Sequence, residues 1–189
     1  MNEGLVYNNI RFEFSDIDQA SAFATLFTGS NPCFSGIAGD KTFDFEKEKE
    51  VSILNDPEYL GNYTKENYSP KNLFSSTIGD ELKIATQGRS DVYSIAPDAE
   101  SAILSAGHAA NGAFWMDNTN GKWATTTYYK GIPWYVDRYN NGPESLASRL
   151  ETMVWTPTLP MEKYNAFPYV LDDLPFRYTF SEKFANCYP

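Results

Sequence analysis

The fold is decided by the segment Ile10–Asp40, which reads IRFEFSDIDQASAFATLFTGSNPCFSGIAGD. At its start, apolar side chains recur at every second position, which predicts a strand over Leu5–Phe14. Ser15 and the aspartate after it are typical of a helix start. Apolar residues then recur at helical spacing from Ile17 onward, and Gly29 predicts the helix end. A strand that leads into a helix N-terminus favours an anion site, because unpaired backbone N–H groups point at the ligand.

The second half of this segment resembles a known family. The runs Thr25–Pro32, TLFTGSNP, and Gly36–Asp40, GIAGD, are similar to the nucleophile-helix segment of the alkaline phosphatase superfamily. They most resemble the branch of bacterial phosphate-irrepressible alkaline phosphatases and nucleotide pyrophosphatases/phosphodiesterases. Members usually read TGPxHASIYTGTxP and then GIVGN, and the match over this span needs no gaps. The resemblance covers most of residues 4–140. It implies an α/β fold, a segment of the family's three-layer sandwich, and phosphoric-ester hydrolysis.

The resemblance also implies which positions would carry the chemistry. The leading Thr of the motif is the family's nucleophile and falls on Gln19, and the closing Asn contacts the transferred phosphoryl group and falls on Asp40. A second stretch, Ala96–His108, matches the region that carries a phosphate-binding Lys-x-Arg pair in the phosphomonoesterases. That pair falls on Asp98 and Glu100. All four positions are substituted, so we assign no catalytic, cofactor-binding or metal-ligating residue.

These substitutions oppose the family's reaction on physical grounds. Phosphoryl transfer depends on positioning and on cationic stabilisation of the developing charge. If the family fold holds, Asp40, Asp98 and Glu100 converge on the same pocket and repel a phosphate. Asp98 follows Pro97 and is typical of an N-cap for a helix over Ala99–Ser105, with a metal-ligand role as the alternative.

The resemblance further implies two zinc ions held by Asp and His side chains. One ligand would precede the first strand of this chain, and the others would lie downstream of the matching segment. The sequence holds one histidine, His108, which we expect to be a hydrogen-bonded structural residue at a turn. We therefore expect no cofactor in this chain, and zinc only if the family site is completed outside it.

Composition excludes several classes of partner. The 189 residues carry a net charge of −10, which argues against a nucleic-acid or anionic-membrane surface. No apolar run is long enough to span a bilayer, and Met1–Gly4 lacks the basic and apolar regions of a signal peptide. An extracytoplasmic location, periplasmic or secreted, is implied by the resemblance alone. Cys33 and Cys187 are expected to be unpaired, with a disulfide as the alternative.

The rest of the chain completes the prediction of a single, partial alkaline-phosphatase-like domain over 1–189. We expect an α/β order, with a solvated loop over Lys41–Glu50, then a helix that Ser69 and Pro70 open and Gly88 stops, and then a buried strand over Val92–Ala96. A hairpin insertion is expected over 113–129. It would be followed by short helices over Pro133–Tyr139 and Pro143–Leu150 and by an irregular aromatic-rich cap over 150–189. The buried stripe of the long helix would hold Leu73, Phe74, Thr77, Ile78, Leu82 and Ala85.

Three functional hypotheses follow. The first is a phosphatase/phosphodiesterase-fold protein, a pseudoenzyme, whose catalytic apparatus is lost or absent from this chain. The second is an active metal-dependent hydrolase of phosphoric mono- or diesters with a displaced nucleophile. The third is a cation- or glycan-binding module that uses the acidic cluster and aromatics such as Trp123 and Trp134. A phosphorylated small molecule or a glycan is the partner class that these hypotheses imply.

Overall fold

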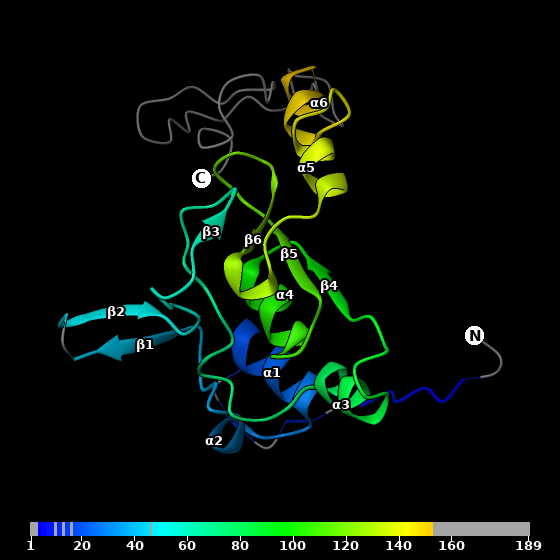
Figure 1. Ribbon diagram of the computed structural model, residues 1–189. Coiled ribbons are helices and arrows are strands. Elements are labelled where there is room, and N and C mark those ends of the chain that lie inside the picture. The colour runs from blue at the N-terminus through cyan, green and yellow to red at the C-terminus, as the bar shows by residue number, and fades with distance from the viewer. Residues whose placement is uncertain (1–3, 10, 13, 16, 46, 153–189) are drawn as a thin grey trace, which may run out of the picture.

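The computed structural model describes residues 4–152 except positions 10, 13, 16 and 46 (Figure 1). Its helices are α1 (Gln19–Thr28), α2 (Pro32–Ser35), α3 (Ile78–Ala85), α4 (Ala99–Ala106), α5 (Trp134–Asn140) and α6 (Leu146–Thr152). Its strands are β1 (Lys41–Asp44), β2 (Lys49–Ser52), β3 (Gly61–Asn62), β4 (Tyr93–Ala96), β5 (Gly112–Met116) and β6 (Trp123–Thr126). A 3₁₀ turn over Thr127–Tyr129 follows β6.

Within the described residues, the main sheet has four strands in the order β3-β6-β5-β4. Strands β4 and β5 are parallel and are joined by α4, which makes a βαβ unit. Strands β5 and β6 are antiparallel, with Trp115 opposite Ala124. The Asp117 carboxylate caps the turn between them by accepting backbone N–H groups of Thr119 and Asn120. The predicted hairpin and the α/β class are therefore confirmed.

The core lies around α4, which packs on β4 and β5 and also on α1 (Figure 1). Small side chains make the contact between the two helices possible, because Ala20, Ala24 and Ala102 are completely buried. The larger side chains of α4, Ile103 and Leu104, are also completely buried. Each such aliphatic side chain contributes about 1.5–3 kcal/mol by burial. This packing fixes the N-terminus of α1 beside that of α4.

Several helix-end signals in the sequence are confirmed. Helix α1 ends at Gly29, which adopts the left-handed conformation with φ 68° and donates its N–H to the Thr25 carbonyl. Helix α4 begins after Asp98, as predicted. Helix α5 starts directly after Pro133, and α6 starts three residues later than the predicted Pro143. The predicted cap over 150–189 lies outside the described residues, apart from the end of α6.

The prediction of a strand over Leu5–Phe14 is wrong. The described residues of this stretch form no strand, and Leu5, Val6 and Tyr7 are 80%, 62% and 73% exposed. Alternation alone did not make a strand, because none of the described strands pairs with this stretch. The helix that follows begins at Gln19 instead of near Ser15, because Asp18 provides the cap.

Two further predictions need correction. Lys41–Glu50 is solvent-exposed as expected, but it forms the hairpin β1–β2 and not a loop. The helix predicted from Ser69 begins only at Ile78, since the Ser69 hydroxyl donates to buried Asp56 and Thr77 provides the cap. The predicted buried stripe is wrong at Phe74, Ile78 and Leu82, which are 76%, 71% and 48% exposed. Within the described residues, no helix is long and apolar enough to cross a bilayer.

The strand predicted over Val92–Ala96 forms as β4, but it is not buried on both faces as expected. The Ser94 hydroxyl faces α4 and lies 2.6 Å from the Ser105 hydroxyl. Tyr93 and Ile95 point to the opposite face and are 52% and 69% exposed. Only one face of this strand is therefore buried.

Candidate functional site

The N-terminus of α1 is built by Asp18. Its carboxylate Oδ1 accepts the Ser21 backbone N–H at 2.8 Å, and the Ser21 hydroxyl accepts the Asp18 backbone N–H at 3.1 Å. This reciprocal capping box explains why the helix begins at Gln19. Burial alone would raise the pKa of Asp18, but the hydrogen bonds from Ser21 and from the Asp40 backbone together lower it below its ordinary value. Asp18 is therefore a fixed negative charge at this helix end.

The same carboxylate holds the loop that carries Asp40. Asp18 Oδ2 accepts the Asp40 backbone N–H at 2.6 Å, which ties Asp40 to the start of α1. The loop lies close to the helix, because a Cβ atom at Gly39 would stand 3.2 Å from Asp18 Oδ2. The side chain of Asp40 is exposed to solvent. A backbone N–H that would be free to bind an anion at this helix end is thus already occupied by a carboxylate.

Gln19 bridges α1 and α4. Its side-chain amide Nε2 donates to Asp98 Oδ2 at 2.6 Å and to Ser101 Oγ at 2.7 Å. Asp98 is the N-cap of α4, because its Oδ1 accepts the Ser101 backbone N–H at 2.8 Å. The Ser101 hydroxyl donates to Asp98 Oδ2 at 3.0 Å. Asp98 therefore acts in the cap predicted from the sequence, and the Gln19 amide is a donor to it.

Glu100 completes an acidic cluster. The glutamate is half-buried, and burial is the largest cause that raises the pKa of its carboxyl group. The negative charges of Asp98, Asp40 and Glu66 also raise this pKa, so those three carboxylates lie near enough to interact with it. None of the ion pairs found among the described residues involves any of these four side chains.

The structure therefore brings Gln19, Asp40, Asp98 and Glu100 together, and we call this group, with Asp18, the acidic cradle. Sequence reasoning missed Glu66, which lies in the irregular segment after β3. Burial is the first cause that raises the pKa of the Tyr68 phenol, and the Glu66 carboxylate beside it raises this pKa further. No pattern in the sequence marks Glu66, because its place depends on how the segment packs against β5 through Tyr68 and Trp115.

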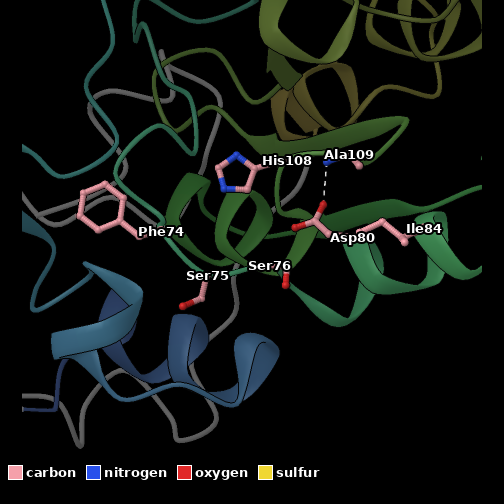
Figure 2. A pocket seen from close by; sticks show the side chains of 7 residues that line it. All are labelled: Phe74, Ser75, Ser76, Asp80, Ile84, His108 and Ala109. Carbon is pink, nitrogen blue, oxygen red and sulfur yellow. Dashed lines mark hydrogen bonds between the residues drawn. The ribbon is translucent and has the colours of Figure 1, made fainter.

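A shallow hollow of about 240 Å³ lies elsewhere, between α3 and the turn after α4 (Figure 2). Its polar groups are already in use: Asp80 accepts the Ala109 N–H at 2.6 Å and the Thr77 N–H at 2.9 Å. His108 Nε2 lies 2.8 Å from the Leu73 carbonyl oxygen, consistent with the structural role expected for this residue. Among the described residues, no group of three or more His, Cys, Asp or Glu side chains is arranged to hold a metal ion.

Comparison with known proteins gives three sequence relatives. The chain is 36% identical over 169 residues to alkaline phosphatase PafA of Elizabethkingia meningoseptica, covering 87% of this chain and 31% of that protein. It is 31% identical to alkaline phosphatase PhoV of Synechococcus elongatus, covering 100% of this chain and 34% of that protein. It is also 34% identical to a protein of Myroides odoratus named calcium-transporting ATPase, covering 87% of this chain and 30% of that protein. No protein-family model matches the chain.

The solved structures agree with the sequence relatives. The crystal structure of wild-type PafA matches with a TM-score of 0.66 and 36% identity, covering 77% of this chain and 29% of that one. A PafA variant in which a threonine, an asparagine, a lysine and an arginine are replaced together matches with the same TM-score. This chain spans about a third of the length of the curated relatives it matches. In sequence and in fold, the chain belongs to the alkaline phosphatase superfamily.

Proposed function

We propose that this part of the chain is an alkaline-phosphatase-like module that does not hydrolyse phosphate esters by the family's route. The observation that carries the proposal is the bond from the Gln19 amide to Asp98 and Ser101. An amide that donates to a helix cap stands where the resemblance places a nucleophilic hydroxyl. An amide nitrogen is not a nucleophile of the kind that forms a phosphoryl-enzyme.

The spacing in the PafA variant supports this assignment of positions. Its replaced threonine and asparagine are as far apart in sequence as Gln19 and Asp40. Its replaced lysine and arginine are as far apart as Asp98 and Glu100, and the gap between the two pairs is only slightly shorter in this chain. This spacing supports the proposal that an amide and three carboxylates stand here at the four polar or cationic positions of that protein.

The negative charge of the acidic cradle opposes the binding of a phosphate ester. Two unit charges 4 Å apart repel by about 1 kcal/mol in bulk water and by about 4 kcal/mol at the effective dielectric near a protein surface. A phosphate dianion beside Asp40, Asp98 and Glu100 would meet several such terms of the same sign. The half-burial of Glu100 reduces the screening that water would supply. The cradle therefore disfavours the ground state and the transition state of phosphoryl transfer alike.

The described residues do not fit the zinc site of the superfamily. Zinc in catalytic sites needs at least three protein ligands from His, Cys or carboxylate side chains. The one histidine faces the Leu73 carbonyl, and the carboxylates of Asp18 and Asp98 are occupied by capping bonds. We derive no step through zinc. By relation to PafA and PhoV, we further propose a location outside the cytoplasm.

Metal analysis combined with an ester assay tests the proposal. The purified 189-residue chain is analysed for zinc by mass spectrometry and assayed with p-nitrophenyl phosphate and bis-p-nitrophenyl phosphate, with PafA as the positive control. We expect no stoichiometric zinc and no turnover above buffer. Stoichiometric zinc, together with turnover abolished by Ser21→Ala or by Ser101→Ala, would overturn the proposal in favour of a hydrolase with a displaced nucleophile.

A further inference from the structure

Strands β1 and β2 form a two-stranded hairpin that projects to one side of the helices and the main sheet (Figure 1). Of the described elements, neither strand packs extensively on anything but the other. A two-stranded hairpin on its own is marginally stable in water, and its free edges are templates for pairing with another strand. The two edges of this hairpin differ in their side chains.

One hydrogen bond shows which backbone groups point to the free edges. The Ile53 N–H donates to the Asp40 carbonyl at 2.8 Å, one position beyond the ladder of β1 and β2. Backbone groups alternate in direction along a strand, so the next residues that point away from the partner strand follow by counting. Phe43 and Glu50, which are register partners, direct their N–H and C=O groups outward from β1 and from β2.

The β2 edge is protected by charge against a second copy of the chain. Residues 47–50 read Lys-Glu-Lys-Glu. In an antiparallel pairing, outward-pointing residues face outward-pointing residues. Two copies that paired along the exposed half of β2 would therefore set Glu50 opposite Glu50 or Lys49 opposite Lys49. Like charges directly opposite each other destabilise a sheet, so this edge resists self-pairing.

The β1 edge is apolar instead. Phe43 and Phe45 are 48% and 85% exposed, and their ring centroids lie 5.1 Å apart. Two β1 strands that pair antiparallel around Phe43 would set Phe43 opposite Phe43 and Thr42 opposite Asp44. Aromatic pairs stabilise neighbouring strands, and a threonine hydroxyl can donate to a carboxylate. This edge is therefore complementary to itself.

The distribution of charge also favours the hairpin as the point of contact. The chain carries a net charge of −10, which opposes self-association through its acidic body. Lys41–Glu50 holds three lysines and four acidic residues, so only one unit of that net charge belongs to the hairpin. Because the hairpin projects from the body, contact through it keeps the other charges of two copies further apart, and salt screens them over about 8 Å.

We propose that β1 pairs antiparallel with β1 of a second copy, which makes a four-stranded sheet β2-β1-β1-β2 around a twofold axis. The contact uses the same surface on both copies, as twofold interfaces do. Two strands of four residues make a small interface, so we expect a weak dimer with a dissociation constant of about 10–100 µM. The inference does not depend on the proposed function, because no residue of the acidic cradle lies in β1.

A concentration series tests whether the chain dimerises through this edge. The mass of the purified 189-residue chain is followed by light scattering and sedimentation equilibrium from about 1 to about 300 µM, a range that brackets the expected dissociation constant. Phe43→Lys sets two lysines opposite each other at the proposed axis. Glu50→Gln is the matched control, because it changes the charge by the same amount at the register partner of Phe43, on the other edge.

Disulfide cross-linking tests the register. In a background with Cys33→Ser and Cys187→Ser, a single cysteine is introduced by Phe43→Cys or by Glu50→Cys, and oxidised dimers are separated on a non-reducing gel. The Phe43→Cys thiols should cross-link, because opposite residues on neighbouring strands have Cα atoms about 5.5 Å apart, within the reach of a disulfide. The Glu50→Cys thiols should not, because both β1 strands would lie between them.

We expect concentration-dependent dimers of the wild-type chain and of Glu50→Gln, and association of Phe43→Lys that is at least about tenfold weaker. A wild-type chain that stays monomeric over the whole range would overturn the proposal. So would Phe43→Lys that associates as tightly as the wild type, or cross-linking of Glu50→Cys as fast as that of Phe43→Cys. Circular dichroism shows whether Phe43→Lys folds, and if it does not, the cross-linking pair decides.

Discussion

Replacing Asp98 with alanine tests whether this carboxylate is a structural cap or is kept for another role. Asp98→Ala removes the acceptor of the Ser101 backbone N–H at 2.8 Å and of the Gln19 amide at 2.6 Å. Loss of an N-cap costs typically about 1 kcal/mol, and loss of an exposed hydrogen bond to a carboxylate about 1 kcal/mol more. We therefore expect about 2 kcal/mol of destabilisation, or a decrease of about 4–8 °C in Tm for a chain of this size.

The assay is urea and thermal unfolding followed by circular dichroism at 222 nm. Asn31→Ala is the matched control, because Asn31 caps α2 without a side-chain hydrogen bond. It should change stability by less than about 0.5 kcal/mol. Asp98→Asn keeps the oxygen that accepts the Ser101 N–H but replaces the other oxygen by an NH2 group, so it should restore about half of the loss, since Asn and Asp are similar caps. If Asp98→Ala lowers the free energy of unfolding by no more than Asn31→Ala does, the carboxylate does not act as a structural cap. The alternative, that Asp98 binds a ligand, would then be favoured.

Three other substitutions test the surroundings of the cradle and the core. Glu100→Gln should raise Tm at about pH 8 and have no effect at about pH 3.5, because a carboxyl pKa raised in the folded state makes stability fall as pH rises above its ordinary value of 4.5. Gly107→Ala should cost about 3 kcal/mol, since φ is 74° and the new Cβ would collide with Thr77 and Asp80. Tyr129→Phe should cost about 1–2 kcal/mol, because the buried hydroxyl donates to the Gly107 carbonyl at 2.8 Å.

Two of these substitutions have a matched control variant, and all three are measured by the same unfolding assay. Glu58→Gln, at an exposed site, should not change Tm at either pH, and an equal gain at both pH values for Glu100→Gln would contradict the charge argument. Gly88→Ala has a similar φ of 76° and open space around it, so it should cost only about 1–2 kcal/mol. Equal losses of stability in Gly107→Ala and Gly88→Ala would show that the collision at Gly107 contributes nothing. A Tyr129→Phe variant as stable as the wild type would show that the buried bond contributes nothing.

The parts of the fold that the sequence predicted are those set by local chemistry. Gly29 ends α1 through its own left-handed backbone, and Asp98 caps α4 through a bond three residues away. The failures depend on distant partners. The alternating pattern over Leu5–Phe14 makes no strand without a neighbour, and Ser69 is diverted from a helix start by Asp56.

In the candidate site too, contacts between residues far apart in the sequence could not be predicted from local patterns. Gln19 and Asp98 are 79 positions apart, and neither composition nor periodicity could bring them together. Only the family resemblance predicted that these positions meet, because a conserved fold carries long-range contacts that spacing does not encode. Glu66 was missed because its position comes from the packing of Tyr68 against Trp115, which no short pattern indicates.

The central claim is that the cradle of Gln19, Asp40, Asp98 and Glu100 does not bind phosphate esters. A measurement of phosphate binding tests this claim most directly. Inorganic phosphate is titrated into the purified chain by isothermal calorimetry, and the titration is repeated with Gln19→Ala. The account predicts no saturable binding by either protein up to about 10 mM phosphate, which bounds the binding free energy at about −3 kcal/mol or weaker. Saturable phosphate binding by the wild-type chain that is weakened by Gln19→Ala would contradict it.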